Sequence, residues 1–133
     1  MQENNVFEYA VIRIVPRVER EEFLNVGVVL FCKKTKYLHM LFELNEERVV
    51  AAFPWADVDE IREHLLAFEQ ICKGNNQPGT IASLDVQSRF KWLTAKRSTI
   101  IQTSVTHPGF CSDAEKKLQQ LFNELVSLTN KNS

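Results

Sequence analysis

The sequence is poor in the residues that cross-link a chain or interrupt its regular structure. Its 133 residues include four glycines, four prolines and three cysteines. The cysteines, Cys32, Cys72 and Cys111, are odd in number and far apart, which excludes both a disulfide framework and a paired-cysteine metal motif. We expect reduced thiols in a reducing compartment.

Long apolar runs and sorting signals are lacking as well. The longest apolar run, residues 26–32, is far shorter than the ~20 residues that a membrane span needs. Residues 1–5 contain neither the basic part nor the apolar part of a secretory signal. These absences predict a cytoplasmic protein with no membrane segment.

An excess of either charge is also missing. Lys and Arg number 16 and Asp and Glu number 17, so the net charge is −1, and we expect no nucleic-acid partner. Hydrophobic residues make up 44% and charged residues 25%, which excludes the disordered class and indicates a folded globular chain. The length predicts a single domain over residues 1–128, with a frayed polar tail over 129–133.

Four strands are expected, over residues 7–15, 25–32, 37–44 and 98–104. The first two are apolar on both faces, which is typical of strands that are covered on both sides. Gly27, inside the second strand, predicts a bulge or a close backbone approach. The short polar turn at 33–36 joins the second and third strands in an antiparallel hairpin. Residues 107–109, with a proline and a glycine, predict a turn.

Four helices are expected, over residues 45–52, 58–73 and 85–95 and from Ser112 onward. Asn45 is a suitable N-cap for the first helix, and Gly74 is placed to end the second. Ser112 and Glu115 have the spacing of a capping box that opens the last helix. The order is three strands, three helices, one strand and one helix. We therefore predict an α+β fold, with helices packed on one face of a mainly antiparallel sheet of about four strands.

Two segments carry a family resemblance. They are residues 9–30 (YAVIRIVPRVEREEFLNVGVVL) and residues 97–104 (RSTIIQTS), the latter followed by His107 and Gly109. These segments resemble DUF3037, a family of bacterial single domains of unknown function. The resemblance implies a protein partner, because members are often encoded beside HipA-like kinase proteins. It supplies no catalytic residues.

The first candidate site contains Arg13, Glu22 and Asn25. Arg13 is the only charge in an otherwise apolar strand, and an unpaired buried charge costs several kcal/mol. In a structural interpretation, Glu19 or Glu22 pairs with Arg13, and Asn25 hydrogen-bonds the turn. In a functional interpretation, Arg13 binds an anion in a cleft at the edge of the sheet.

A second candidate site surrounds Trp92. Arg89, Trp92 and Lys96 are three and four residues apart and share one helical face, and Arg97 and Ser98 follow directly. Basic groups beside an aromatic ring and a hydroxyl can hold a phosphate and stack on a base. Trp and Arg are also enriched at protein interfaces. The structural alternative is that Trp92 packs against a neighbouring element while the cations are solvated.

A third group consists of polar residues at and after the last predicted strand, including Gln102, His107 and Cys111. His107 and Cys111 would in principle form a nucleophilic pair, but the spacing indicates no third, orienting group. Local hydrogen bonding is the alternative. The other two histidines, His39 and His64, are isolated, and no metal site is expected.

Two functional hypotheses follow. The leading one is a non-catalytic protein-interaction or regulatory module that uses Arg89, Trp92, Lys96 and Arg97, with a kinase-like protein as partner. The rival is a small enzyme or a phosphate- or nucleotide-binding domain, whose site gathers Arg13, Glu22, Arg97, Gln102 and His107. The motifs of Walker loops, dinucleotide folds, serine hydrolases and kinases are lacking, and no cofactor is expected.

Overall fold

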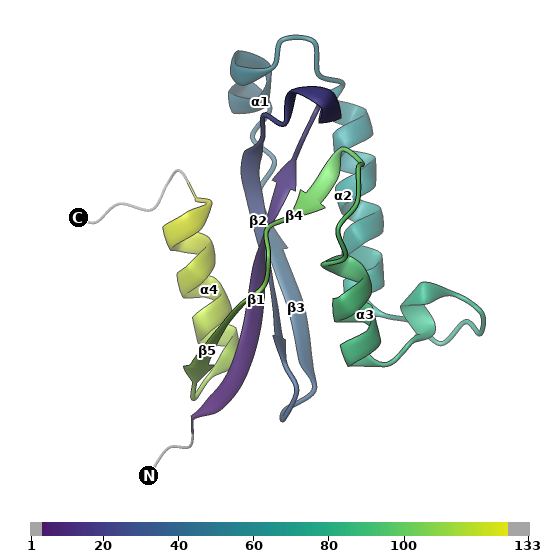
Figure 1. Cartoon of the computed structure of the whole chain (residues 1–133), viewed down its shortest axis with the longest axis vertical. Coiled ribbons are helices and arrows are strands. Elements are labelled where there is room, and N and C mark those ends of the chain that lie inside the picture. The colour runs from purple at the N-terminus through teal and green to yellow at the C-terminus, as the bar shows by residue number, and fades with distance from the viewer. Residues whose placement is uncertain (1–3, 128–133) are drawn as a thin grey trace.

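A twisted antiparallel sheet of five strands forms the centre of the structure, a computed structural model that describes residues 4–127 (Figure 1). The strands are β1 (Asn5–Ile14), β2 (Leu24–Cys32), β3 (Tyr37–Phe42), β4 (Ile101–Thr103) and β5 (His107–Cys111). Their order is β3-β2-β1-β4, and β5 also pairs with β1. The α+β class and the antiparallel sheet are confirmed.

Four α-helices accompany the sheet: α1 (Glu46–Ala52), α2 (Val58–Lys73), α3 (Val86–Leu93) and α4 (Ala114–Leu125). Short 3₁₀ turns, η1 (Val18–Arg20) and η2 (Ile81–Ser83), lie in the connections. Asn45 caps α1 by accepting a hydrogen bond from the backbone N–H of Arg48, at 3.0 Å. Gly74 ends α2 with a positive φ of 80°, as predicted. No helix within residues 4–127 is long and apolar enough to cross a bilayer.

The two faces of the sheet carry separate apolar clusters, because side chains alternate along each strand. On one face, Val29 and Phe31 of β2 join a core that α1, α2 and α3 complete. On the other face, Val28 and Leu30 pack with Leu118 of α4. The expectation that all helices pack on one face is therefore wrong, since α4 covers the opposite side (Figure 1).

Gly27 lies at an irregularity of β2, as its sequence position predicts. The pairing register between β1 and β2 shifts after Ile12, which faces Gly27. A Cβ atom on Gly27 would lie 2.6 Å from the carbonyl oxygen of Leu41 and 2.9 Å from the Cβ of Phe42. Only glycine allows β3 to approach this closely.

One edge of the sheet is divided between two short strands. The structure places a strand, β5, where residues 107–109 predicted a turn, and it shortens the predicted strand 98–104 to β4. Ser104 joins the two: its N–H donates to the carbonyl of Val11 at 2.9 Å, and its Oγ accepts from the N–H of Val11 at 2.9 Å. Pairing with β1 overrides the local turn preference of Pro108 and Gly109.

The helix ends differ slightly from the sequence expectation. Asp113, rather than Ser112, caps α4 by accepting from the N–H of Lys116 at 3.1 Å. The third helix ends at Leu93 instead of residue 95, and Thr94 turns back to bond the carbonyl of Phe90. The predicted tail, 129–133, lies outside the described residues.

Candidate functional site

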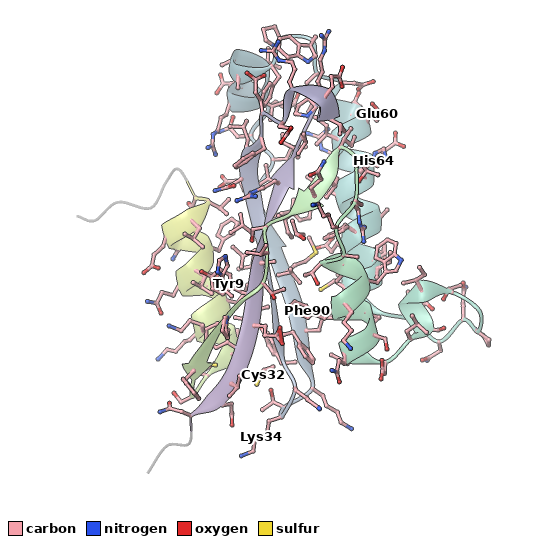
Figure 2. The ribbon with its side chains drawn as sticks, in the orientation of Figure 1. Tyr9, Cys32, Lys34, Glu60, His64 and Phe90 are labelled. Atoms are coloured by element: carbon pink, nitrogen blue, oxygen red, sulfur yellow. The ribbon has the colours of Figure 1, made fainter. Side chains whose placement is uncertain are left out.

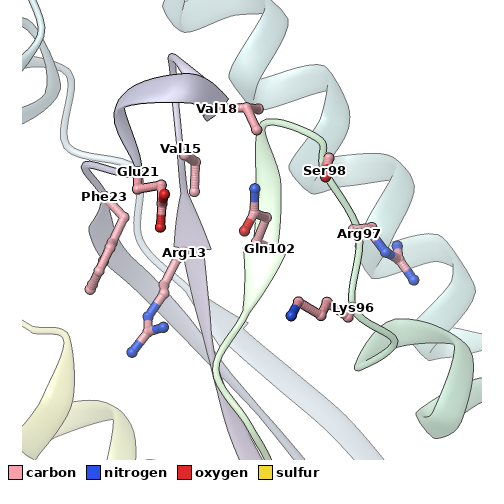
Figure 3. A pocket seen from close by; sticks show the side chains of 9 residues that line it. All are labelled: Arg13, Val15, Val18, Glu21, Phe23, Lys96, Arg97, Ser98 and Gln102. Atoms are coloured by element: carbon pink, nitrogen blue, oxygen red, sulfur yellow. The ribbon is translucent and has the colours of Figure 1, made fainter.

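A cleft opens where β1 and β4 pair, on the face of the sheet that carries α4. Arg13 and Gln102 are cross-strand partners there, so their side chains share this face. The cleft has a volume of about 360 Å³. Figure 3 shows the residues that line it: Arg13, Val15, Val18, Glu21, Phe23, Lys96, Arg97, Ser98 and Gln102.

The Arg13 side chain has no polar partner among the described residues. It is partly buried, its guanidinium Cζ is 4.2 Å from the centre of the Phe23 ring, and its buried Nε has no hydrogen-bond partner among the described residues. No described carboxylate lies within ion-pair distance. The expected ion pair with Glu19 or Glu22 is therefore wrong.

Glu22 has a different partner. Its carboxylate accepts two hydrogen bonds from Arg20, at 2.7 and 3.0 Å, and this contact holds the pKa of Glu22 below its usual range. Both side chains are exposed, so the pair contributes little to stability. Glu22 is not among the residues that line the cleft.

Asn25 is the cross-strand partner of Arg13 on β2. Its Oδ1 is buried and has no hydrogen-bond partner in the described chain, so the expected bond to the turn is wrong. The Nε donor of Arg13 and the Oδ1 acceptor of Asn25, two residues that face each other across β1 and β2, thus both lack a hydrogen-bond partner among the described residues. Such groups are rare in folded proteins and call for a specific explanation.

The opposite wall of the cleft is formed by residues 96–102, which connect α3 to β4 and include part of β4. Figure 3 shows the Lys96 side chain directed toward β4 and Arg13. Gln102 donates through its side-chain nitrogen to the carbonyl of Thr99 at 2.9 Å, which fixes its amide and leaves the oxygen free to accept. Ser98 is exposed at the rim.

Arg97 borders the cleft, but its guanidinium points away from it (Figure 3). The Cζ lies 4.3 Å from the centre of the Trp92 ring and 5.9 Å from that of Phe68, and Nη2 donates to the carbonyl of Trp92. Burial lowers the pKa of Arg97. Arg97 therefore serves mainly to hold Trp92.

The surface predicted around Trp92 is not continuous. α3 ends at Leu93, so the helical spacing does not extend to Lys96, which joins the Arg13 cleft instead. The Arg89 guanidinium occupies the space beside Gly74, and its Nε is buried and unpaired within the described chain. Of the four residues predicted to share this surface, Trp92 and Arg97 are the two that contact each other.

An apolar groove runs beside Trp92, between α2 and β4. It has a volume of about 480 Å³ and is lined by His64, Ala67, Phe68, Ile71, Trp92, Arg97, Thr99 and Ile101. The Phe68 and Trp92 rings lie 6.4 Å apart, and Trp92 is partly buried against the core. This packing agrees with the structural alternative for Trp92, while the groove keeps a binding role open.

His107 and Cys111 lie at opposite ends of β5, so they do not form a nucleophilic pair. His107 faces Tyr9, with ring centres 5.2 Å apart, and Cys111 faces Asn5. Burial raises the pKa of the Cys111 thiol, which keeps it protonated. His107 is also absent from the Arg13 cleft. No three metal-ligating side chains among residues 4–127 gather where they would hold an ion.

Trp55 is a surface aromatic residue that no sequence pattern indicated as part of a site. Its side chain is 46% exposed, and the Arg17 and Arg20 guanidinium carbons lie 4.9 and 5.8 Å from its ring centre. The sequence feature that could have indicated it is a tryptophan directly after Pro54 that belongs to no amphipathic helix or strand. Trp55 anchors the connection between β1 and β2, which also supplies Val18, Glu21 and Phe23 to the cleft.

The first signature of the family resemblance runs through β1, this connection and β2. Residues 9–126 match a family described as a protein of unknown function, DUF3037. The chain belongs to the DUF3037 family. Among curated proteins and among solved structures, no relative is matched. A function proposed for this DUF3037 chain therefore rests on its own geometry.

Proposed function

We propose that this DUF3037 chain is a non-catalytic binding domain of the bacterial cytoplasm that holds an anionic group in the Arg13 cleft. One observation carries the proposal: the Nε of Arg13 is buried in the wall of a cleft and lacks any partner in the described chain. A buried polar group without a hydrogen bond costs about 1–3 kcal/mol. An anion that accepts from Arg13 removes this cost.

The charges of the lining favour an anion. Arg13 and Lys96 contribute two positive charges, and Glu21 contributes one negative charge. The Arg13 guanidinium carbon lies 4.2 Å from the centre of the Phe23 ring, and this cation–π contact restricts the orientation of the guanidinium N–H donors. The Lys96 side chain extends toward Arg13 from the other wall (Figure 3), and we propose that one anionic group accepts from both cations.

A phosphate fits this arrangement better than a single carboxylate. It has enough oxygens to accept from Arg13 and Lys96 together while a third faces the Ser98 hydroxyl. The volume of about 360 Å³ is at the lower end of the range of small-molecule sites. A phosphorylated metabolite or a mononucleotide is the ligand class we propose.

The lining supports binding rather than catalysis. Among the described residues that line the cleft, Glu21 is the one carboxylate, and no histidine or cysteine accompanies it. General acid–base or nucleophilic chemistry needs a reactive group with a positioned partner.

A thermal-shift and calorimetric titration tests the proposal with inorganic phosphate, pyrophosphate and adenosine monophosphate. A ligand at 100 times its dissociation constant raises the unfolding free energy by about 2.7 kcal/mol. Arg13→Met and Lys96→Met should each remove most of this gain. Arg62→Met is the matched control, because Arg62 is an arginine with only surface ion pairs, to Glu46 and Asp59. A flat response to all three anions, or binding that survives Arg13→Met, contradicts the proposal.

The Trp92 groove favours a second candidate function, a protein-interaction module with a HipA-like kinase as partner. Tryptophan and arginine are enriched among the residues that dominate binding energy, and Trp92 with Arg97 borders an apolar groove. Co-purification with the kinase-like protein of the neighbouring gene tests it. We expect Trp92→Ala to abolish the complex, and an unchanged complex contradicts this candidate.

A further inference from the structure

A second cleft lies at the opposite end of the molecule, between the β2–β3 turn and the start of α3. It has a volume of about 390 Å³ and is lined by Phe31, Lys33, Lys36, Asp85, Val86 and Gln87. Figure 2 shows Lys34, in the same turn, at the lower tip of the hairpin. None of these residues lines the Arg13 cleft, so any ligand here is a separate one.

The floor of this second cleft is apolar and is held in place by packing against the core. Phe31 is 4% exposed and stacks on Phe90, with ring centres 5.0 Å apart. Val86 is partly buried against the same core. Leu84, just before α3, is 46% exposed. The floor therefore suits an apolar side chain from a binding partner.

The rim of the cleft is basic. Lys33 and Lys36 are exposed at the two corners of a turn that the N–H of Lys36 closes on the carbonyl of Lys33, at 3.2 Å. Neither side chain lies within ion-pair distance of a described carboxylate. Asp85 is the one acid of the lining, and it caps α3 by accepting from the backbone N–H of Ser88 at 2.9 Å. Hydrogen bonding from the side chain and then the backbone of Ser88 keeps the pKa of Asp85 below its usual range.

Charge is unevenly distributed along the sheet. Around the connection after β1 and the starts of α1 and α2, acids outnumber bases. The acids are Glu19, Glu21, Glu22, Glu46, Glu47, Asp57, Asp59 and Glu60, and the bases are Arg17, Arg20, Arg48 and Arg62. The hairpin end toward α3 carries mainly bases: Lys33, Lys34, Lys36, Lys73, Arg89 and Lys91. The acids Asp113 and Glu115 face Tyr37 on the α4 side of the hairpin, away from this cleft.

From this charge complementarity and the apolar floor we infer that the second cleft docks an acidic segment of a protein partner. An aliphatic or aromatic side chain of the segment fills the floor over Phe31 and Val86. Carboxylates on either side of it pair with Lys33 and Lys36. A free phosphate would leave the floor empty, because it has no apolar group to place over Phe31 and Val86. A nucleic acid would need stacking rings, but Phe31 is buried in the floor.

Fluorescence anisotropy with the labelled peptide Glu-Asp-Leu-Phe-Asp-Glu tests the inference. We expect saturable binding that weakens as sodium chloride rises from about 50 to about 500 mM. Replacing the peptide's carboxylates by amides, or its Leu and Phe by Ser, should each weaken binding at least about tenfold, since both contacts are needed.

Variants of the chain locate the peptide. Lys33→Gln combined with Lys36→Asn should weaken binding at least about tenfold, and Asn tolerates the positive φ of 54° at position 36. The control is Lys116→Gln with Lys117→Gln on α4, which removes the same charge elsewhere and should leave binding unchanged. Equal melting temperatures establish that each variant is folded.

Three results with the peptide overturn the inference. They are absence of binding at millimolar peptide, equal loss in the control variant, and loss caused by Arg13→Met instead, which would assign the peptide to the other cleft. Tighter binding of a single-stranded oligonucleotide that depends on Lys33 and Lys36 would also overturn it in favour of a nucleic-acid surface.

Discussion

The two faces of the sheet differ in how completely they are covered. Three helices close the face that holds Ile12, Val29 and Phe31, while α4 alone covers the other, mainly beside the lower part of the sheet (Figure 1). The uncovered upper part of the α4 face is where Arg13 lies. A charged side chain is tolerated on β1 because the core there is thin. The candidate site thus follows from incomplete packing.

Along β1 the contrast appears residue by residue. Ala10, Ile12 and Ile14 are fully buried and point into the larger core. Val11 and Arg13 alternate with them and point to the α4 face, where Arg13 meets only Phe23 and the far wall of the cleft. The same strand therefore supplies core residues from one face and lines the proposed anion cleft with the other.

The largest expected effect tests the packing difference directly. Leu65→Ala in the larger core should lower the unfolding free energy by about 4 kcal/mol, whereas Leu118→Ala under α4 should cost about 2 kcal/mol, because a smaller cluster relaxes into the space. Urea denaturation measures both. Leu66→Ala, at a residue 45% exposed on α2, is the control and should change stability by less than about 0.5 kcal/mol. An equal or greater cost at Leu118 would refute the comparison.

An intermediate effect concerns the buried thiols on the two faces. Burial raises the pKa of Cys72, on the α2 side, to about 12. A thiol in the unfolded chain ionises near ~8.5, so above that pH the unfolded chain releases a proton that the folded chain retains. The resulting stability is fully present below about pH 8.5 and falls by up to about 1.4 kcal/mol per pH unit until pH 12.

Urea midpoints at about pH 8 and about pH 10 measure this loss, which should be roughly 2 kcal/mol for Cys72. Cys72→Ala should flatten the dependence. Cys111→Ala, on the α4 face, should flatten it less, because Cys111 is nearer solvent. Tyr37, whose pKa burial raises to about 12, contributes only above its ordinary value of about 10. A wild-type pH slope that persists in Cys72→Ala would contradict the assignment.

The smallest expected effect sharpens the role of Arg13. Arg13→Met should change the unfolding free energy by less than about 1 kcal/mol, because it removes an unsatisfied buried N–H while losing one contact with an aromatic ring. Chemical denaturation of the ligand-free chain is the measurement. A loss above about 3 kcal/mol is typical of a broken buried ion pair and would assign Arg13 to the framework instead.

The parts of the fold that could be predicted from the sequence are those that depend on contacts between neighbouring residues in the chain. Caps such as Asn45 and glycines such as Gly27 and Gly74 act through neighbouring backbone, so the sequence locates them. The apolar faces of β1 and β2 had already indicated cover on both sides, yet which helix crosses to the second face depends on tertiary packing. β5 was missed because Pro108 favours a turn in isolation, while pairing with β1 decides the outcome.

The Arg13 cleft could be predicted only in part, because it also depends on contacts between distant parts of the chain. Arg13 stood out as a lone charge in an apolar strand. Its neighbours Lys96 and Gln102 come from the far end of the chain, and the pairing of β4 with β1 that joins them is set by non-local contacts. Trp55 was overlooked because its contacts with Arg17 and Arg20 form between separate loops.

The divided edge of the sheet has a consequence for behaviour at high concentration. An exposed strand edge offers unpaired backbone groups on which another chain can build a strand. Here that edge consists of two short pieces, β4 and β5, interrupted at Ser104, and Pro108 of β5 has no N–H to donate. A second molecule would find no uninterrupted ladder to extend along this side, so we expect the edge that borders the Arg13 cleft to be a poor template for fibril growth.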